Sequence, residues 1–182
     1  MRKVVLYQLL SLDGVAEEPG DWFFDPDQAV VDNLARVISS QDDVLLGRGT
    51  YDYWAGYWPT SDVQPFADFI NGTPKHVFTS GRPDVEWARS TLVTDSAVDY
   101  VAELKRAEGR DIGVHGSIEL ARTLLRAGLV DELQLVIAPA IAYRGRRLFD
   151  GGDDLVRLEL ASVDRSPGGA LFCGYRVGPG TV

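Results

Sequence analysis

The feature that most constrains the fold is an alternation of short apolar segments with amphipathic ones. Apolar runs of strand length occur at residues 4–10, 44–46, 76–79, 111–114 and 133–138, and apolar residues at helical spacing follow most of them. This alternation is typical of parallel sheets, because the chain returns to start the next parallel strand through a helix on a sheet face. The sequence therefore predicts a three-layer α/β fold, with a central mixed but mostly parallel sheet and helices on both faces.

Start signals place the helices between these strands. Asp25 is expected to cap the first helix, with Gln28 completing a capping box, and Asp62 is expected to cap a second helix. Two later helices are expected to begin at serine caps, Ser96 and Ser117.

The C-terminal part has the pattern of an antiparallel hairpin. Two apolar-rich segments, 157–163 and 171–177, flank a turn at 167–169 that contains proline and two glycines. The sequence shows no repeat, low-complexity tract or linker, so residues 1–182 are expected to form a single domain.

Charge and composition exclude several classes of partner. The net charge is -9, which predicts no affinity for nucleic acid or an anionic membrane. The chain has one cysteine and two histidines, too few for a zinc signature, so no metal site is expected. The lone cysteine and the lack of an export signal favour a cytoplasmic protein. An acidic protein of this kind must bind phosphates through local backbone N–H groups and a few placed arginines.

Three turns that follow predicted strands combine glycine, hydroxyl and basic residues, and we call them corners. The first corner comprises Gly47, Arg48, Gly49 and Thr50, the second Thr79, Ser80, Gly81 and Arg82, and the third His115, Gly116, Ser117 and Ile118. Each is also compatible with an ordinary exposed turn. Because ligands in such sheets bind beyond the carboxyl ends of the strands, we expect the three corners to lie together and bind phosphate.

The corners also carry a family resemblance. Together with Ser11-Leu12-Asp13-Gly14, the first two corners resemble the dihydrofolate-reductase-like superfamily. Within it, the stretch from Val114 to Phe149 is closest to the reductase domain of the bacterial bifunctional riboflavin-biosynthesis deaminase/reductase. That likeness rests on three segments: 128–133, Ala138-Pro139 and Arg147-Leu148-Phe149.

This resemblance implies NADPH as cofactor and a homodimer as the assembly. The first corner would hold the 2′-phosphate and pyrophosphate, and the second would flank the adenosine. The third corner occupies the family's diglycine turn, where His115 replaces the first glycine and puts the family's cis peptide in question. The residues implied for the nicotinamide and substrate pocket are Tyr7, Gln8, Leu9, Asp13, Trp22 and Trp54.

Departures from a true dihydrofolate reductase argue against folate as substrate. The carboxylate that holds the pterin would fall on Val31 or, with a gap, on Asp32, and its supporting threonine falls on Val136. Asp32 is therefore either a general acid with a raised pKa or a solvated helix residue.

Two other side chains and one basic cluster leave alternatives open. His115 is either a proton relay or a turn residue, and Asp13 is either a pocket residue or a turn former. The basic cluster Arg144-Gly145-Arg146-Arg147 either grips a phosphate or forms a solvated loop.

The sequence thus predicts an NADPH-dependent reductase that transfers a hydride to a C=N or C=O group of a small pterin- or pyrimidine-like heterocycle. The alternative is a non-catalytic, NADPH-binding homodimer on the same fold, and a third possibility is a homodimer with an empty cleft.

Overall fold

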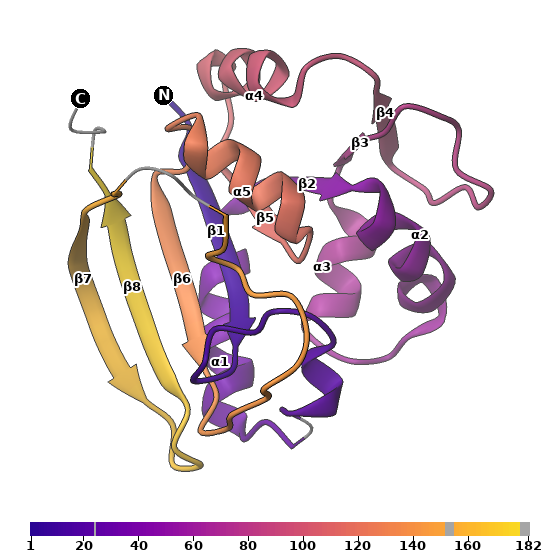
Figure 1. Cartoon of the computed structure of the whole chain (residues 1–182). Coiled ribbons are helices and arrows are strands. Elements are labelled where there is room, and N and C mark those ends of the chain that lie inside the picture. Colours follow the sequence, from indigo (N-terminus) through magenta and orange to yellow (C-terminus); the bar gives the residue numbers. More distant parts are fainter. Residues whose placement is uncertain (24, 152–154, 179–182) are drawn as a thin grey trace.

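A computed structural model describes residues 1–23, 25–151 and 155–178 (Figure 1). It contains an eight-stranded sheet in the order β4-β3-β2-β5-β1-β6-β8-β7. The first six strands in this order pair in parallel, and β8 and β7 are antiparallel. The strands are β1 (Val4–Leu10), β2 (Gln41–Gly47), β3 (Lys75–Phe78), β4 (Ser90–Val93), β5 (Asp111–His115), β6 (Glu132–Ile137), β7 (Leu158–Arg165) and β8 (Leu171–Val177).

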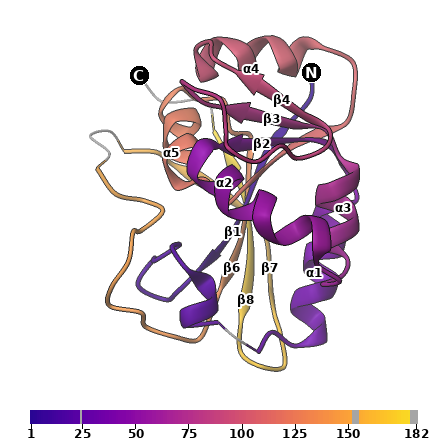
Figure 2. The same ribbon diagram turned by 90° about the vertical axis from the view of Figure 1, so that its right-hand side faces the viewer.

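Helices cover both faces of the sheet, and Figure 2 shows α5 on one side with α1 and α3 on the other. The helices are α1 (Gln28–Ile38), α2 (Arg48–Tyr57), α3 (Phe66–Gly72), α4 (Ala97–Arg106) and α5 (Ile118–Arg126). Alternate residues of β1 face opposite layers: Leu6 packs in the core with α4 and α5, whereas Val5 and Tyr7 pack in the core with α1. The predicted fold class is confirmed.

Two predicted helix caps are placed at the wrong residue. Helix α1 begins at Gln28, and its cap is Asp27 rather than Asp25. The Asp27 carboxylate accepts from the N–H of Val30 (3.3 Å) and from that of Gly168 (2.7 Å) in the β7–β8 turn, a tertiary contact that local sequence does not reveal.

Helix α3 begins at Phe66, four residues beyond Asp62, and Pro65 occupies its N-cap position without a capping side chain. By contrast, the predicted cap of α4 is confirmed, because Ser96 Oγ accepts from the N–H of Asp99.

Strand β4 was not predicted. It pairs in parallel with β3 at the edge of the sheet, and only Val93 of its four residues is buried. A short edge strand with exposed side chains lacks the apolar run by which the inner strands are recognised.

Candidate functional site

The carboxyl ends of the parallel strands place the three corners along one edge of the sheet. Strands β3, β2, β5, β1 and β6 are consecutive neighbours. The second, first and third corners follow β3, β2 and β5, so they succeed one another in space, and the segments that follow β1 and β6 come next.

The first and third corners are joined by two hydrogen bonds. The N–H of Gly47 donates to Ser117 Oγ (2.9 Å), and the N–H of Ser117 donates to Thr50 Oγ1 (3.0 Å). Gly116 has a φ of 60°, and a Cβ at this position would lie 3.3 Å from Thr50 Cγ2. A glycine is therefore favoured here both by the backbone conformation and by the close approach of the two corners.

Arg48 joins the first corner to the second. Its Nη1 donates to the carbonyl oxygens of Gly81 (3.1 Å) and Arg82 (3.3 Å) and lies 3.4 Å from Thr79 Oγ1. Its Nε donates to the Asp52 carboxylate (2.6 Å), while Nη2 has no hydrogen-bond partner within the described part of the chain. The three corners thus lie together, and the N–H groups of Arg48 Nη2 are the guanidinium donors that no described residue accepts.

Two helix N-termini meet at the joined corners. Helix α2 starts at Arg48 and helix α5 at Ile118, and no side chain caps either of them. The Ser117 side chain does not act as the predicted cap, because its backbone is left-handed (φ 56°) and its hydroxyl accepts from Gly47 instead. The N–H groups in the first turn of each helix therefore donate to no capping side chain. Together these N–H groups form a site that suits an anion.

A groove of about 480 Å³ runs beside the second corner. Thr79, Gly81 and Arg82 line one part of it, and Leu92 and Thr94, from β4 and the residue after it, line another. Hydroxyl, backbone and guanidinium groups next to an apolar side chain suit a planar base attached to a phosphorylated sugar.

The His115 side chain does not face this edge. It is 2% exposed, and its Nε2 lies 2.7 Å from Oε1 of Gln41. Its ring packs against Tyr7, Phe66 and Phe69. Burial lowers the pKa of His115 to about 3, so the imidazole is neutral at physiological pH. The structure therefore favours the turn-residue alternative over the proton relay, with only the backbone of His115 at the third corner.

The third corner has a trans peptide where the family pattern has a cis one. Among the described residues the single cis peptide bond precedes Pro65, so His115 and Gly116 are joined in trans.

The predicted pocket residues fall into two groups. Tyr7 and Gln8 are buried in β1, and burial raises the pKa of the Tyr7 phenol. Leu9, Trp22 and Trp54 are half-buried. Trp54 lies beside the third corner, where a Cβ on Gly116 would be 3.5 Å from its ring. Trp54 is thus the predicted aromatic residue whose contacts place it at the corners.

Asp13 and the basic cluster make contacts that connect the loops to each other, and they do not line an open pocket. The Asp13 carboxylate accepts from the N–H groups of Ala142 and Tyr143. Arg146 pairs with Glu17 (2.6 Å), and Arg147 Nε donates to the Asp13 carbonyl oxygen (2.9 Å). These contacts favour the loop interpretation of the cluster and the turn-forming role of Asp13.

Asp32 is exposed on α1, where its carboxylate accepts from Gln28 Nε2 (2.8 Å). The Asp32 carboxylate lies at the surface and not in an apolar pocket, so the structure favours the solvated alternative.

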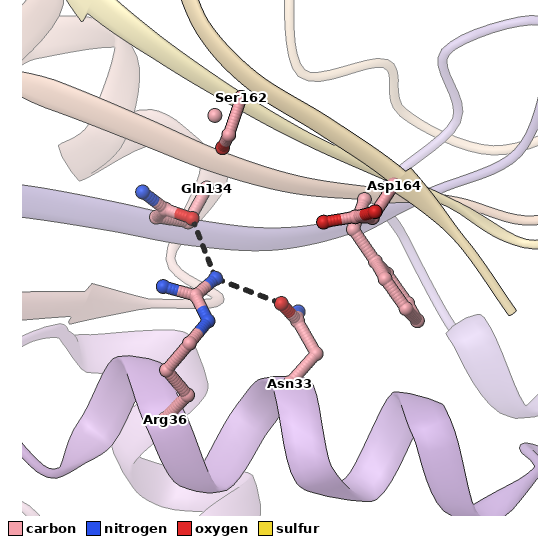
Figure 3. Close-up of a pocket in the computed structure, with 7 residues that line it drawn as sticks. Asn33, Arg36, Gln134, Ser162 and Asp164 are labelled. Carbon is pink, nitrogen blue, oxygen red and sulfur yellow. Dashed lines mark hydrogen bonds between the residues drawn. The ribbon is translucent and has the colours of Figure 1, made fainter.

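A second cavity, of about 260 Å³, lies between α1 and strands β6, β8 and β7 (Figure 3). Arg36 points into it from α1 and donates to Asn33 Oδ1 (2.8 Å) and Gln134 Oε1 (3.2 Å), with Ser162 and Asp164 on the strand side. None of its lining residues belongs to a corner, so it is separate from the anion site.

The sequence patterns did not identify Gln41, whose side chain contacts the His115 side chain of the third corner. Gln41 is buried at the start of β2, and a Cβ on Gly113 would lie 2.1 Å from its Oε1. Gly113 therefore makes room for the Gln41–His115 pair, a requirement that appears only when β2 and β5 are paired.

The eight-stranded, mostly parallel mixed sheet agrees with the dihydrofolate-reductase-like superfamily that the sequence resembles. Residues 2–172 match the family model of the RibD C-terminal domain, and the chain belongs to this family. No helix in the described ranges is long and apolar enough to cross a membrane.

Known proteins agree with this assignment. An uncharacterized protein of Bacillus subtilis (strain 168), YyaP, is 26% identical over an alignment of 182 residues. The alignment covers 96% of this chain and 94% of YyaP. A putative riboflavin biosynthesis protein from Shewanella sp. PV-4 superposes with a TM-score of 0.79 at 19% identity, over 97% of this chain and 99% of that one.

Two further solved structures share the fold. A pyrimidine reductase-like protein from Corynebacterium diphtheriae gives a TM-score of 0.70 at 17% identity, over 98% of this chain and 93% of that one. A Thermotoga maritima diaminohydroxyphosphoribosylaminopyrimidine deaminase/5-amino-6-(5-phosphoribosylamino)uracil reductase gives 0.71 at 17% identity, over 97% of this chain and 57% of that one. The family supports a reductase of the riboflavin-pathway type, and these neighbours share the fold.

Proposed function

We propose that this protein is an NADPH-dependent reductase that transfers a hydride to a C=N or C=O group of a small pterin- or pyrimidine-like heterocycle. One observation carries the proposal: three glycine- and hydroxyl-bearing corners are connected by direct hydrogen bonds at one edge of the sheet. A reductase of the riboflavin-pathway type would need such a place for a phosphorylated dinucleotide.

The residues present fit that dinucleotide. The uncapped N-termini of α2 and α5 would bind its pyrophosphate, and Nη2 of Arg48 would bind the 2′-phosphate together with the second corner. A Cβ added at Gly49 or Gly81 would have no other atom within 4 Å. Both positions are therefore open, and ligand atoms can approach the backbone there. The groove beside the second corner would take the adenine.

The bound cofactor would supply the hydride, and the chain would orient the reactants. The substrate's new proton would come from water, because Asp32 is exposed and His115 is buried and uncharged.

The proposal is tested with Arg48→Ala and, as a matched control, Arg157→Ala, which changes an exposed arginine that belongs to no corner. A charge-assisted contact contributes about 1.5–3 kcal/mol, so Arg48→Ala should weaken NADPH binding roughly tenfold to a hundredfold and leave NADH almost unchanged. Calorimetric titration measures both affinities. Equal losses for the two cofactors would refute the role of Arg48.

A non-catalytic NADPH-binding protein is the second candidate, because the corners explain binding without any acid or base at the site. Cofactor oxidation monitored across a panel of pterins and pyrimidines distinguishes the two. Stoichiometric NADPH binding without oxidation by any of them would favour the binding protein.

We further propose that the protein is a homodimer that uses β7. All eight residues of this edge strand are exposed, including Leu160 (54%) and Val163 (57%). An uncovered edge strand with apolar side chains is a template for pairing with another chain, and a second copy would cover it. Sedimentation should show a dimer that Leu160→Lys converts to a monomer; a wild-type monomer would refute this.

A further inference from the structure

The cavity between α1 and strands β6, β8 and β7 is lined mostly by charged, amide and hydroxyl side chains (Figure 3). Its volume is about 260 Å³. Ligand pockets in proteins begin at roughly 300 Å³, so this cavity would take only a small molecule. It shares no residue with the three corners, and its chemistry therefore has to be explained separately from the proposed dinucleotide site.

A β-bulge in β7 directs one polar side chain into this cavity. Leu160 pairs with Tyr175 of β8, but the next pair joins Ser162 to Gly174, so Ala161 is an extra residue. Residues that pair directly across an antiparallel ladder have their side chains on the same face of the sheet. The bulge therefore places the Ser162 hydroxyl beside Gly174, on the face that α1 covers.

The same bulge gives the cavity a carboxylate in place of an apolar side chain. Asp164 pairs with Phe172, which packs in the core with α1, so both lie on the α1 side of the sheet. Without the extra residue, Val163 would be opposite Phe172 and would face the cavity. Bulges are common beside functional sites, where they redirect a side chain.

Gly174 keeps the floor of the cavity open. It pairs with Gln134 of β6 on one side and with Ser162 of β7 on the other. A Cβ at Gly174 would lie 2.5 Å from Ser162 Oγ and 3.4 Å from Gln134 Nε2. A side chain at this position would therefore fill the space between the two polar groups.

The two charged groups of the cavity do not neutralise each other. Arg36 uses Nη2 for its hydrogen bonds to Asn33 Oδ1 and Gln134 Oε1, and no described residue accepts from its Nε or Nη1. Among the same residues, none donates to the Asp164 carboxylate, and it forms no ion pair with Arg36. Figure 3 shows Arg36 on the α1 side of the cavity and Asp164 on the strand side.

These groups are complementary to a molecule that carries both charges. The free N–H groups of Arg36 and of Gln134 Nε2 are donors, and they suit a carboxylate. Asp164 offers only acceptors, and they suit an ammonium group. An anion alone would leave Asp164 without a partner, and a cation alone would leave Arg36 without one.

We propose that this cavity binds a small zwitterion with one carboxylate and one ammonium group, such as an amino acid. Arg36 and Gln134 bind the carboxylate, whereas Asp164 and the Ser162 hydroxyl bind the ammonium group. The hydrocarbon part of the ligand lies against Phe172. This binding site goes beyond the proposed reductase function and does not depend on it.

The site is compatible with the proposed homodimer. A second copy paired with β7 would use main-chain groups in the plane of the sheet. The side chains of Ser162 and Asp164 leave that plane toward α1, so strand pairing does not occupy them.

Calorimetric titration of the whole protein tests the proposal with four zwitterions: glycine, β-alanine, γ-aminobutyrate and 5-aminopentanoate. These probes differ in the separation of their two charges. For each one, the carboxylate and the amine of the same chain length carry a single charge and serve as comparisons. We expect at least one zwitterion to bind, and to bind at least tenfold more tightly than either of its single-charge comparisons.

Two variants each remove one charge and keep a polar side chain. Asp164→Asn should abolish the preference for the zwitterion over the carboxylate, and Arg36→Gln should abolish its preference over the amine. A merely structural role would weaken all probes alike. Asp95→Asn and Arg157→Ala change exposed residues outside the cavity and should alter neither preference. Each cavity variant tests the proposal alone if the other does not fold.

A wild-type protein that binds none of the four zwitterions would overturn the inference. Preferences that persist in both cavity variants would overturn it as well. The proposed NADPH site is tested separately, because NADPH affinity should stay within twofold in Asp164→Asn and Arg36→Gln. A failure of zwitterion binding thus leaves the proposed function intact, and a failure of NADPH binding leaves this inference intact.

Discussion

The buried His115 imidazole makes the free energy of unfolding depend on pH. Its folded-state pKa is about 3, against an ordinary value of 6.5 for an exposed histidine, because burial disfavours the charged ring. Between these two pH values the unfolded chain binds a proton that the folded chain does not. Stability is therefore fully present above pH 6.5 and decreases as the pH falls toward 3.

The size of the effect follows from the pKa difference. Each pH unit within this window lowers the free energy of unfolding by about 1.36 kcal/mol, so His115 alone removes about 5 kcal/mol between pH 6.5 and pH 3. A natural domain has a total stability of only about 5–15 kcal/mol, so the effect is a large share of it.

Guanidinium chloride unfolding at pH 7 and pH 4.5 measures this, with His115→Gln as the comparison because glutamine does not titrate. Carboxylates contribute to both proteins and cancel in the difference. Wild type should lose about 2–3 kcal/mol more than the variant between the two pH values. If both proteins lose the same amount, the neutral, buried state assigned to His115 is wrong.

Two further predictions concern buried groups. Gly113→Ala should lower the free energy of unfolding by about 1–3 kcal/mol, because a Cβ there would lie 2.1 Å from Gln41 Oε1. The denaturation midpoint should therefore fall for Gly113→Ala but not for Gly56→Ala, which has open space around it. An unchanged midpoint for Gly113→Ala would contradict this packing. Lys75 is fully buried, its Nζ donates to the carbonyl oxygens of Ile70 and Thr73, and burial lowers its pKa to about 8. Wild-type stability should therefore rise by about 3 kcal/mol between pH 8 and 10.5 relative to Lys75→Met, since the unfolded chain alone binds that proton there; parallel pH profiles would contradict this.

Features with a local cause were predictable from the sequence. Inner strands such as β1 and β5 are buried on both faces, so they form apolar runs that stand out without any tertiary information. The three corners follow such strands, and the topology of a parallel sheet brought them to one edge. Their mutual hydrogen bonds confirm that they lie together; that they bind a nucleotide stays a prediction.

Features with a distant cause were not predictable. Asp27 replaces Asp25 as the cap of α1 because it also binds Gly168, which lies 141 residues away. The partners that bind the Asp13 carboxylate include Ala142 and Tyr143, so a residue expected in the pocket instead clamps two loops. No local pattern encodes such long-range contacts. Strand β4 was not predicted for a related reason, because its mostly exposed side chains do not form an apolar run.

The central claim is that all three corners hold one phosphorylated dinucleotide. Hydrogen–deuterium exchange with and without NADPH tests it directly, because bound phosphates would protect backbone N–H groups that have no partner in the free protein. The account predicts slower exchange in all three corners, 47–50, 79–82 and 115–118, at the same NADPH concentration. Protection that is missing from these segments, or confined to one of them, would contradict it.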